Sequence, residues 1–192
     1  MMAPLPLWDH GEVLWQWSTA VGAALAAAVC DMRNRRIPNL LTGPVLAGGL
    51  CFATCVGGPA GFAESIGGCI VASLPFVLLF IWAGGGAGDA KIMGAIGAWV
   101  GLIGGAVVVV CVALAGGLLA LIWAWRGRKL RSALANVRGI VTGAAFALKG
   151  PASWRGLPAA APGPQTPDGM PYGLAILLGT CLASGIVWLH RI

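Results

Sequence analysis

Residues 89–125, DAKIMGAIGAWVGLIGGAVVVVCVALAGGLLALIWAW, decide the class of fold, because they run for 37 residues with hardly a polar side chain. A membrane-spanning helix needs ~20 mainly apolar residues, with ~17 as the lower limit. One pass would put Arg126 and the cations after it outside, against the tendency of Lys and Arg to stay in the cytoplasm. We therefore predict two passes with a turn near Gly101 to Gly105. Gly97 joins these two in a four-residue spacing that lets helices approach closely.

The composition of the whole chain points the same way. Its 192 residues are 58% hydrophobic and 9% charged, and the mean hydropathy is +0.87, whereas soluble domains carry ~25% charged residues. A soluble globular domain is excluded, and so is a disordered chain, which needs low hydrophobicity and high charge. The net charge of +6 comes from cations in loops between apolar runs. We interpret it as membrane topology and contact with anionic lipid, with no nucleic-acid partner.

The other apolar runs complete an all-α, polytopic membrane protein of about six transmembrane helices, with the N-terminus and the C-terminus outside. We expect a single domain over residues 1–192, with a cytoplasmic loop at 126–170. Within that loop, Leu130 to Leu148 could form an amphipathic helix that lies on the membrane. The remaining predicted spans are Val13 to Cys30, Leu40 to Val56, Phe62 to Trp82 (after an uncharged turn at 57–61) and Tyr172 to Leu189.

Two of the six acidic residues, Asp31 and Asp89, lie at the cytoplasmic ends of predicted spans. An ionisable side chain at such a place is a functional candidate by default. Singly, Asp31 could pair with a neighbouring arginine and Asp89 could cap its helix. Together they can meet, because the spans that carry them reach the same face of the membrane. Two carboxylates at hydrogen-bond range can share one proton, so that one activates water while the other donates to a carbonyl oxygen, as in an aspartic protease.

The residues around Asp89 have structural as well as functional interpretations. The glycines within 84–88, including Gly86 and Gly88, permit close backbone approach and positive φ. They could form a tight turn or let an extended substrate lie against Asp89. Lys91 could keep one carboxylate ionised or anchor the helix end in the cytoplasm. Both alternatives stay open for each feature.

The residues of the segment between the first two spans can also be explained by structural roles alone. Arg33 is typical of a topology signal, Pro38 cannot continue a helix interior, and Asn39 suits the N-cap of the next helix. Glu64 lies near the predicted outer face, where water can solvate it. We expect no cofactor and no metal, because there is no HExxH motif, no CxxC pair and no cluster of metal ligands. The tryptophans predict an interfacial belt at span ends: Trp8, Trp15, Trp17, Trp82, Trp99, Trp123, Trp125 and Trp188.

These motifs resemble those of a known family, the prepilin peptidases, which are GxGD-type membrane aspartyl proteases. The resemblance covers residues ~14–190 and is specific because a DxRxxxIPN motif precedes the GxGD motif by one helical hairpin. It implies that Asp31 and Asp89 are the catalytic pair and that Gly86, Gly88, Lys91, Arg33, Pro38 and Asn39 support them. The matching segments are Asp31 with Arg33 and Ile37-Pro38-Asn39, Gly86-Ala87-Gly88-Asp89 with Lys91, Gly97, Trp99 and Gly101, and Met170-Pro171-Tyr172-Gly173.

The resemblance further implies cleavage of the leader peptide of type IV prepilin-like substrates at the cytoplasmic face of the bacterial inner membrane. The expected partners are prepilins or pseudopilins and the lipid bilayer, and homo-oligomerisation stays open. Larger members carry a cysteine-bearing insert between the first two spans and also act as N-methyltransferases. The segment from Asp31 to Pro38 is short and has no cysteine, so methylation is not expected. This short form resembles the peptidases of tight-adherence (Flp) pilus systems.

Two other classes of function remain as alternatives. A small proton- or cation-coupled transporter would place its acids at mid-bilayer and repeat its halves with inverted topology. A non-catalytic pilus-assembly subunit would keep its function after Asp→Asn changes at both positions.

Overall fold

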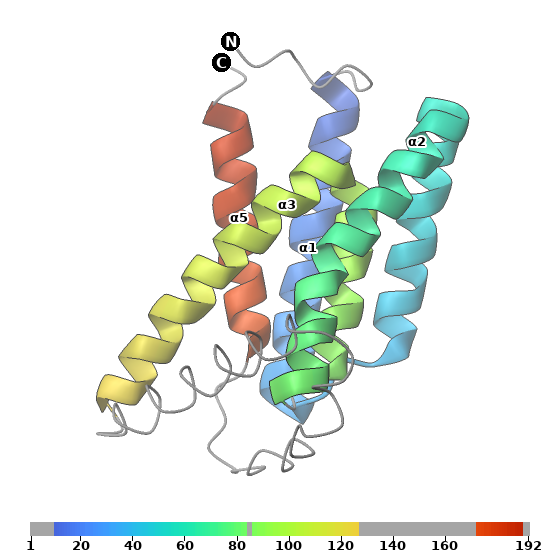
Figure 1. Cartoon of the computed structure of the whole chain (residues 1–192). Helices are drawn as coiled ribbons and strands as arrows, with labels where there is room; N and C mark the ends of the chain where they lie inside the picture. The colour runs from blue at the N-terminus through green and yellow to red at the C-terminus, as the bar shows by residue number, and fades with distance from the viewer. Residues whose placement is uncertain (1–9, 84–85, 127–171, 190–192) are drawn as a thin grey trace, which may run out of the picture.

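The computed structural model describes residues 10–83, 86–126 and 172–189. These residues form helices and no strand (Figure 1). Each helix is long and apolar enough to cross a membrane. The prediction of an all-α, multi-pass membrane protein is confirmed. The helices are α1 (His10–Asn34), α2 (Asn39–Ala83), α3 (Ala87–Arg126) and α5 (Tyr172–Leu189).

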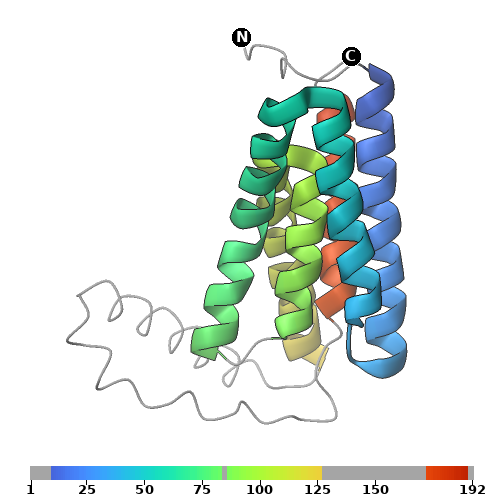
Figure 2. The ribbon, with the colours of Figure 1, turned by 90° about the vertical axis from the view of Figure 1, so that its right-hand side faces the viewer.

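The two longest helices each reverse direction at one glycine. The backbone of α2 turns at Gly58 (φ 58°, ψ −145°) and that of α3 at Gly101 (φ 73°, ψ −174°), a conformation that glycine adopts without the steric cost of a Cβ. A straight helix of 45 residues would be about 68 Å long, more than twice the ~30 Å hydrocarbon layer. Figure 2 shows both helices as hairpins, with the α3 reversal set lower than that of α2.

The structure has four helices among the residues it describes, fewer than the about six that were predicted, because α2 and α3 each consist of two helical limbs joined at a glycine. The reversals nevertheless fall where turns were predicted, within 57–61 and 101–105. Helical hydrogen bonding resumes directly on both sides of a single glycine, so no loop separates the limbs. The first limb of α3 comprises residues 87–100, which is 14 residues. The predicted amphipathic helix at Leu130 to Leu148 and the rest of the 126–170 loop beyond Arg126 lie outside the described residues.

Glycines let the limbs of α2 and α3 touch backbone to backbone. A Cβ at Gly68 would collide with the backbone of Gly97 and Gly101, and a Cβ at Gly105 would lie 3.1 Å from the Gly68 carbonyl oxygen. The close approach predicted for the four-residue glycine spacing is confirmed. Around this contact the core consists of small and branched side chains, among them Ala72, Ile92, Ile96, Val108 and Val112.

Two hydrogen bonds tie the second limb of α2 to the α3 reversal. The backbone N–H of Leu102, just past Gly101, donates to Glu64 Oε2 at 3.1 Å. The buried Ser65 hydroxyl donates to the Ala98 carbonyl oxygen at 2.7 Å. From its position in the sequence, Glu64 was expected only to be solvated by water. The structure gives it a further role. It binds a backbone N–H that the reversal leaves without a helical partner.

Tryptophan placement corrects the belt prediction in part. Trp15 and Trp125 are exposed, whereas Trp17 is buried in the core at 5% exposure. The Trp99 indole donates its Nε1 proton to the Val45 carbonyl oxygen at 2.7 Å. Trp17 and Trp99 thus hold helices together.

Candidate active site

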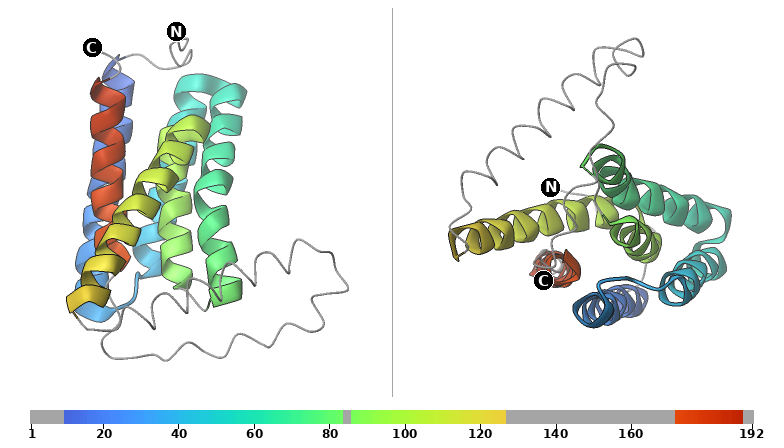
Figure 3. Two further views of the ribbon diagram at one scale, coloured as in Figure 1. Left: turned by 60° about the vertical axis from the view of Figure 1, so that its left-hand side comes forward. Right: turned by 90° about the horizontal axis from the view of Figure 1, so that it is seen from below.

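Three helix ends meet at one end of the bundle. Asp31 lies in the last turns of α1, Asp89 in the first turn of α3, and Tyr172 is the first residue of α5. Figure 3 shows these ends gathered on the side opposite the α2 and α3 reversals, with α1, α5 and α3 packed around one another. Asp31 and Tyr172 thereby lie at the same end of the bundle, although they are 141 positions apart in the sequence.

The carboxylate of Asp31 is held by α5. The Gly173 N–H donates to Asp31 Oδ2 at 2.8 Å, using one of the first-turn N–H groups that have no partner within a helix. The positive end of the helix dipole also favours a carboxylate there. A Cβ at Gly173 would lie 2.9 Å from Asp31 Cβ and 3.0 Å from Ala28 Cα, so only glycine allows this approach. Asp31 is therefore anchored by α5, and not by a neighbouring arginine.

Asp89 is half-buried and is the third residue of α3, inside the helix and not at its cap. Its backbone N–H donates to the Gly86 carbonyl oxygen at 3.2 Å. The carboxyl group lies close enough to Asp31 for direct electrostatic interaction. The Asp89 carboxyl group also acts electrostatically on the Tyr172 phenol, and the next residue, Gly173, binds Asp31. Two carboxyl groups and one phenol thus form a single cluster.

The motif glycines act through close contact and not through positive φ. In the part of the chain that the structure describes, positive φ at glycine occurs only at Gly58 and Gly101, so Gly86 and Gly88 do not use the positive φ that glycine permits. A Cβ at Gly86 would lie 2.8 Å from Asp89 Oδ2, and a Cβ at Gly88 would lie 3.2 Å from Ile37 Cβ. The other glycines of the run, at 84 and 85, fall outside the described residues.

The connection from α1 to α2 is short and tightly turned. Arg35 has a φ of 50°, and its N–H donates to the Asp31 carbonyl oxygen at 2.8 Å, which is the αL form of a helix C-terminus. A non-glycine residue in this region costs about 1–2 kcal/mol. Pro38 then accepts the Leu41 N–H at 3.0 Å. Arg33 is exposed and has no described contact with either carboxylate.

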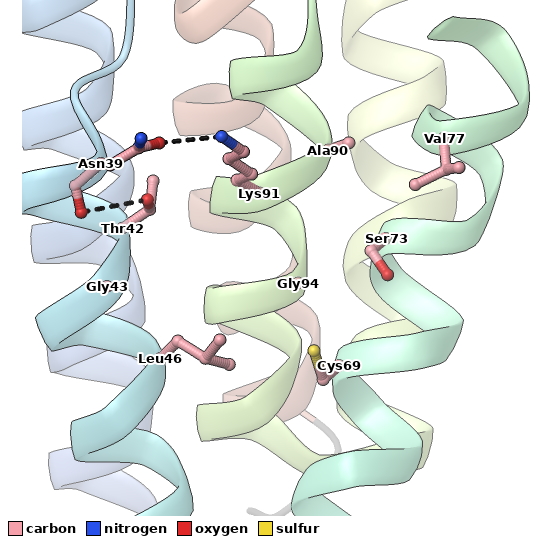
Figure 4. A pocket seen from close by; sticks show the side chains of 10 residues that line it. All are labelled: Asn39, Thr42, Gly43, Leu46, Cys69, Ser73, Val77, Ala90, Lys91 and Gly94. Atoms are coloured by element: carbon pink, nitrogen blue, oxygen red, sulfur yellow. Dashed lines mark hydrogen bonds between the residues drawn. The ribbon is translucent and has the colours of Figure 1, made fainter. Parts of the chain in front are cut away.

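Lys91 and Asn39 bind each other across two helices. Lys91 Nζ donates to Asn39 Oδ1 at 2.8 Å (Figure 4). Asn39 begins α2 as expected, but its side-chain oxygen accepts a hydrogen bond from the Lys91 ammonium group. The carbonyl oxygen of Pro38 accepts hydrogen bonds from the N–H groups of Leu41 and Thr42. Whether the charge of Lys91 acts on a carboxylate stays a prediction.

A mostly apolar groove of about 420 Å³ lies beside this pair, between the two limbs of α2 and over the first limb of α3 (Figure 4). Neither aspartate is among its lining residues in the described part of the chain. The groove is thus separate from the carboxylate cluster. Its walls include Thr42, Leu46, Cys69, Ser73, Val77 and Gly94.

Reasoning from the sequence gave no role to Tyr172 or Gly173. The Tyr172 ring lies edge-on to Phe76 with centroids 6.0 Å apart, and its hydroxyl would touch a Cβ at Gly116. The only signal was the resemblance of Met170-Pro171-Tyr172-Gly173 to the family motif, which marks the place but not the contact.

The fold and the cluster define a class, the helical membrane proteins with two aspartates at adjoining helix ends. A model of the type IV leader peptidase family matches residues 19–122, which is more than half of the chain and includes both aspartates. The chain belongs to the type IV leader peptidase family.

Curated relatives give the family match more detail. Two proteins named prepilin leader peptidase/N-methyltransferase, from Burkholderia pseudomallei strains 1026b and K96243, are each 35% identical to this chain over 114 residues. The match covers 55% of this chain and 36% of each relative, so the chain corresponds to about a third of their length. No solved structure matches the chain.

Proposed function

We propose that this protein is a membrane-embedded aspartyl endopeptidase that removes the leader peptide from type IV prepilin-like substrates. One observation carries the proposal: in a member of the leader peptidase family, Asp31 and Asp89 come from different helices to one electrostatically coupled cluster. A coupled transporter would instead place such acids at mid-bilayer, whereas these two occupy helix ends.

The proposed chemistry uses the two carboxyl groups in opposite protonation states. The ionised group takes a proton from a water molecule, and the water oxygen attacks the carbonyl carbon of the scissile peptide bond. The protonated group donates its proton to the carbonyl oxygen, which gives a neutral tetrahedral intermediate. As the C–N bond breaks, the group that took a proton from water gives it to the nitrogen, and the other group takes a proton from a hydroxyl of the intermediate. An amine and a carboxylic acid leave, and the pair returns to its starting state. The Gly173 N–H holds Asp31 in place during these transfers.

The proposed setting is the bacterial inner membrane, with the cluster facing the cytoplasm. Arg33, Arg35 and Arg36 are exposed at the same end of the bundle as Asp31, and basic residues at helix ends favour the cytoplasmic side. A substrate there is an Flp-type prepilin or a pseudopilin, with its leader in the cytoplasm and its apolar segment in the bilayer. We propose peptidase activity without N-methylation, because the connection between α1 and α2 is only residues 35–38 and carries no cysteine.

The test is co-expression with an Flp-type prepilin and measurement of its mobility shift on leader removal. Asp31→Asn and Asp89→Asn are each expected to lower cleavage roughly 10³-fold or more, as for other residues that act as a unit. Both variants should insert in the membrane at the wild-type level. Full cleavage by either variant contradicts the assignment.

A further inference from the structure

Lys91 points away from the carboxylate that it follows in the sequence. Two residues along an α-helix correspond to a rotation of about 200°, so Lys91 leaves α3 on nearly the opposite side from Asp89. The lysine is exposed while the aspartate is half-buried. Its ammonium group lies 2.8 Å from Asn39 Oδ1 (Figure 4). The ammonium is thus directed toward α2 and not into the carboxylate cluster.

This hydrogen bond closes a short path of contacts between the two aspartates. Asn39 is the first residue of α2, directly after the connection from α1. In that connection, Ile37 lies against Gly88, the residue before Asp89. At its other end, the Arg35 N–H binds the Asp31 carbonyl oxygen. The path therefore runs from the last turn of α1, through the connection, to the first turn of α3.

Apolar packing supports the path as well, since Ile37 and Leu41 pack against the hydrophobic core, but its polar supports are few. Helix α1 packs mainly on α5 and α3, and its contact with α2 is slight. The Trp99 indole binds the Val45 carbonyl oxygen, which fixes the first limb of α2 further along but not its first turn. Among the described side chains, the bond between Lys91 and Asn39 is the polar contact that holds the start of α2 on α3.

We propose that Lys91 and Asn39 are a positioning pair that sets the separation of Asp31 and Asp89 by holding the connection from α1 to α2 against α3. The proposal rests on the proposed peptidase function for its kinetic consequence. Lys91 acts through Asn39 and not through its charge on the carboxylates. A misplacement of about 1 Å in a catalytic group can cost about 100-fold in rate. A connection that is free to move away from α3 is therefore expected to lower kcat.

The kinetic test is a double-mutant cycle with a prepilin substrate. Lys91→Met and Asn39→Leu are each expected to lower kcat about 10- to 100-fold and to leave KM within roughly two-fold. The double variant is expected to be no slower than the single variants, since both remove the same bond. Lys91→Arg and Asn39→Asp keep a donor and an acceptor and should restore most of kcat. Thr54→Val is the control on the same limb, because among the described residues its hydroxyl donates to Leu50 O within the same helix.

Three kinetic results would contradict the positioning pair. If Lys91→Met loses activity while Asn39→Leu keeps it, the lysine acts by its charge or as a topology signal. If the two losses multiply in the double variant, the residues act separately. A lower kcat in Asn39→Asp than in Asn39→Leu would also contradict the proposal, because the added carboxylate should pair with Lys91.

A second readout needs no substrate. In full-length protein whose six native cysteines are replaced by alanine, Ile37→Cys and Gly88→Cys are introduced together and the rate of disulfide formation in membranes is measured. A Cβ at Gly88 would lie 3.2 Å from Ile37 Cβ, slightly closer than the roughly 3.5–4.5 Å of a disulfide, so the two cysteines are within reach after a small outward movement of the connection. Lys91→Met is expected to slow crosslinking several-fold, and Lys91→Arg to restore it. An unchanged rate in Lys91→Met refutes the positioning pair, whereas a wild-type protein that fails to cleave prepilin refutes only the proposed function.

Discussion

At the scale of single residues, Gly173, which contacts Asp31 directly, is the most constrained position of the cluster. Gly173→Ala would bring a Cβ within 2.9 Å of Asp31 Cβ, so α5 must move away from α1 and the hydrogen bond to Asp31 must lengthen. We expect cleavage to fall about 100-fold and stability to fall by about 1–3 kcal/mol. Gly185→Ala, in the same helix with open space around it, is the matched control.

Prepilin cleavage and thermal unfolding in detergent measure the two effects. Wild-type cleavage by Gly173→Ala would show that the approach of α5 to α1 is not needed for the chemistry.

A second residue-scale prediction concerns Gly86. A Cβ there would lie 2.8 Å from Asp89 Oδ2, the mobile end of a side chain, so the carboxylate can rotate away at little cost in stability. Gly86→Ala is therefore expected to lower kcat about 10-fold or more with an unchanged melting temperature. A variant that loses stability but not kcat would reverse this assignment.

The sequence predicted the two aspartates but not the groups that hold them. Asp31 and Asp89 stand out because they are acidic residues at the cytoplasmic ends of predicted spans, where an ionisable side chain is a functional candidate. The Gly173 N–H is 142 positions from Asp31, and Asn39 is 52 positions from Lys91. Neither spacing leaves a local pattern, and a backbone N–H has no sequence signature. These contacts become visible only once helix packing is known.

At the scale of elements, the glycine contact between α2 and α3 is expected to decide stability. Gly97→Ala would place a Cβ against the Gly68 carbonyl oxygen and 2.6 Å from Ala72 Cβ. Neither backbone can yield easily, so we expect a loss of about 1–3 kcal/mol. Gly117→Ala, also in α3 but with nothing within 4 Å, should cause no loss.

The measurement is unfolding of both variants in the same detergent. Equal stability of the two would mean that α2 and α3 separate without cost, contrary to the packing.

The elements also show where prediction from sequence fails. The turns near Gly58 and Gly101 were expected because an apolar run of this length must fold back within a bilayer. The continuity of two limbs as one helix was not expected, because a reversal at a single glycine has no polar loop to mark it in the sequence. The hydrogen bond that the Leu102 N–H donates to Glu64 could not be predicted either, because an acid near a helix start is usually explained by solvation.

At the scale of the whole molecule, composition alone was enough for the class of fold. A chain with 9% charged residues cannot cover a soluble surface, so membrane helices were the remaining choice. The mutual arrangement of α1, α3 and α5 could not be derived, because apolar helices of similar composition pack through small residues in many ways. It is this arrangement that makes a site out of separate helix ends.

The first limb of α3 is shorter than a membrane is thick, but the surrounding helices keep it from the lipid. Its 14 residues, 87–100, rise about 21 Å, well short of the ~30 Å of an ordinary hydrocarbon layer. Residues 92–98 are all buried inside the bundle, so the length of this limb creates no hydrophobic mismatch with the bilayer around it. Prepilin cleavage in phosphatidylcholine vesicles of graded acyl-chain length is therefore expected to depend little on chain length, and a much faster rate with short chains would mean that lipid reaches this limb.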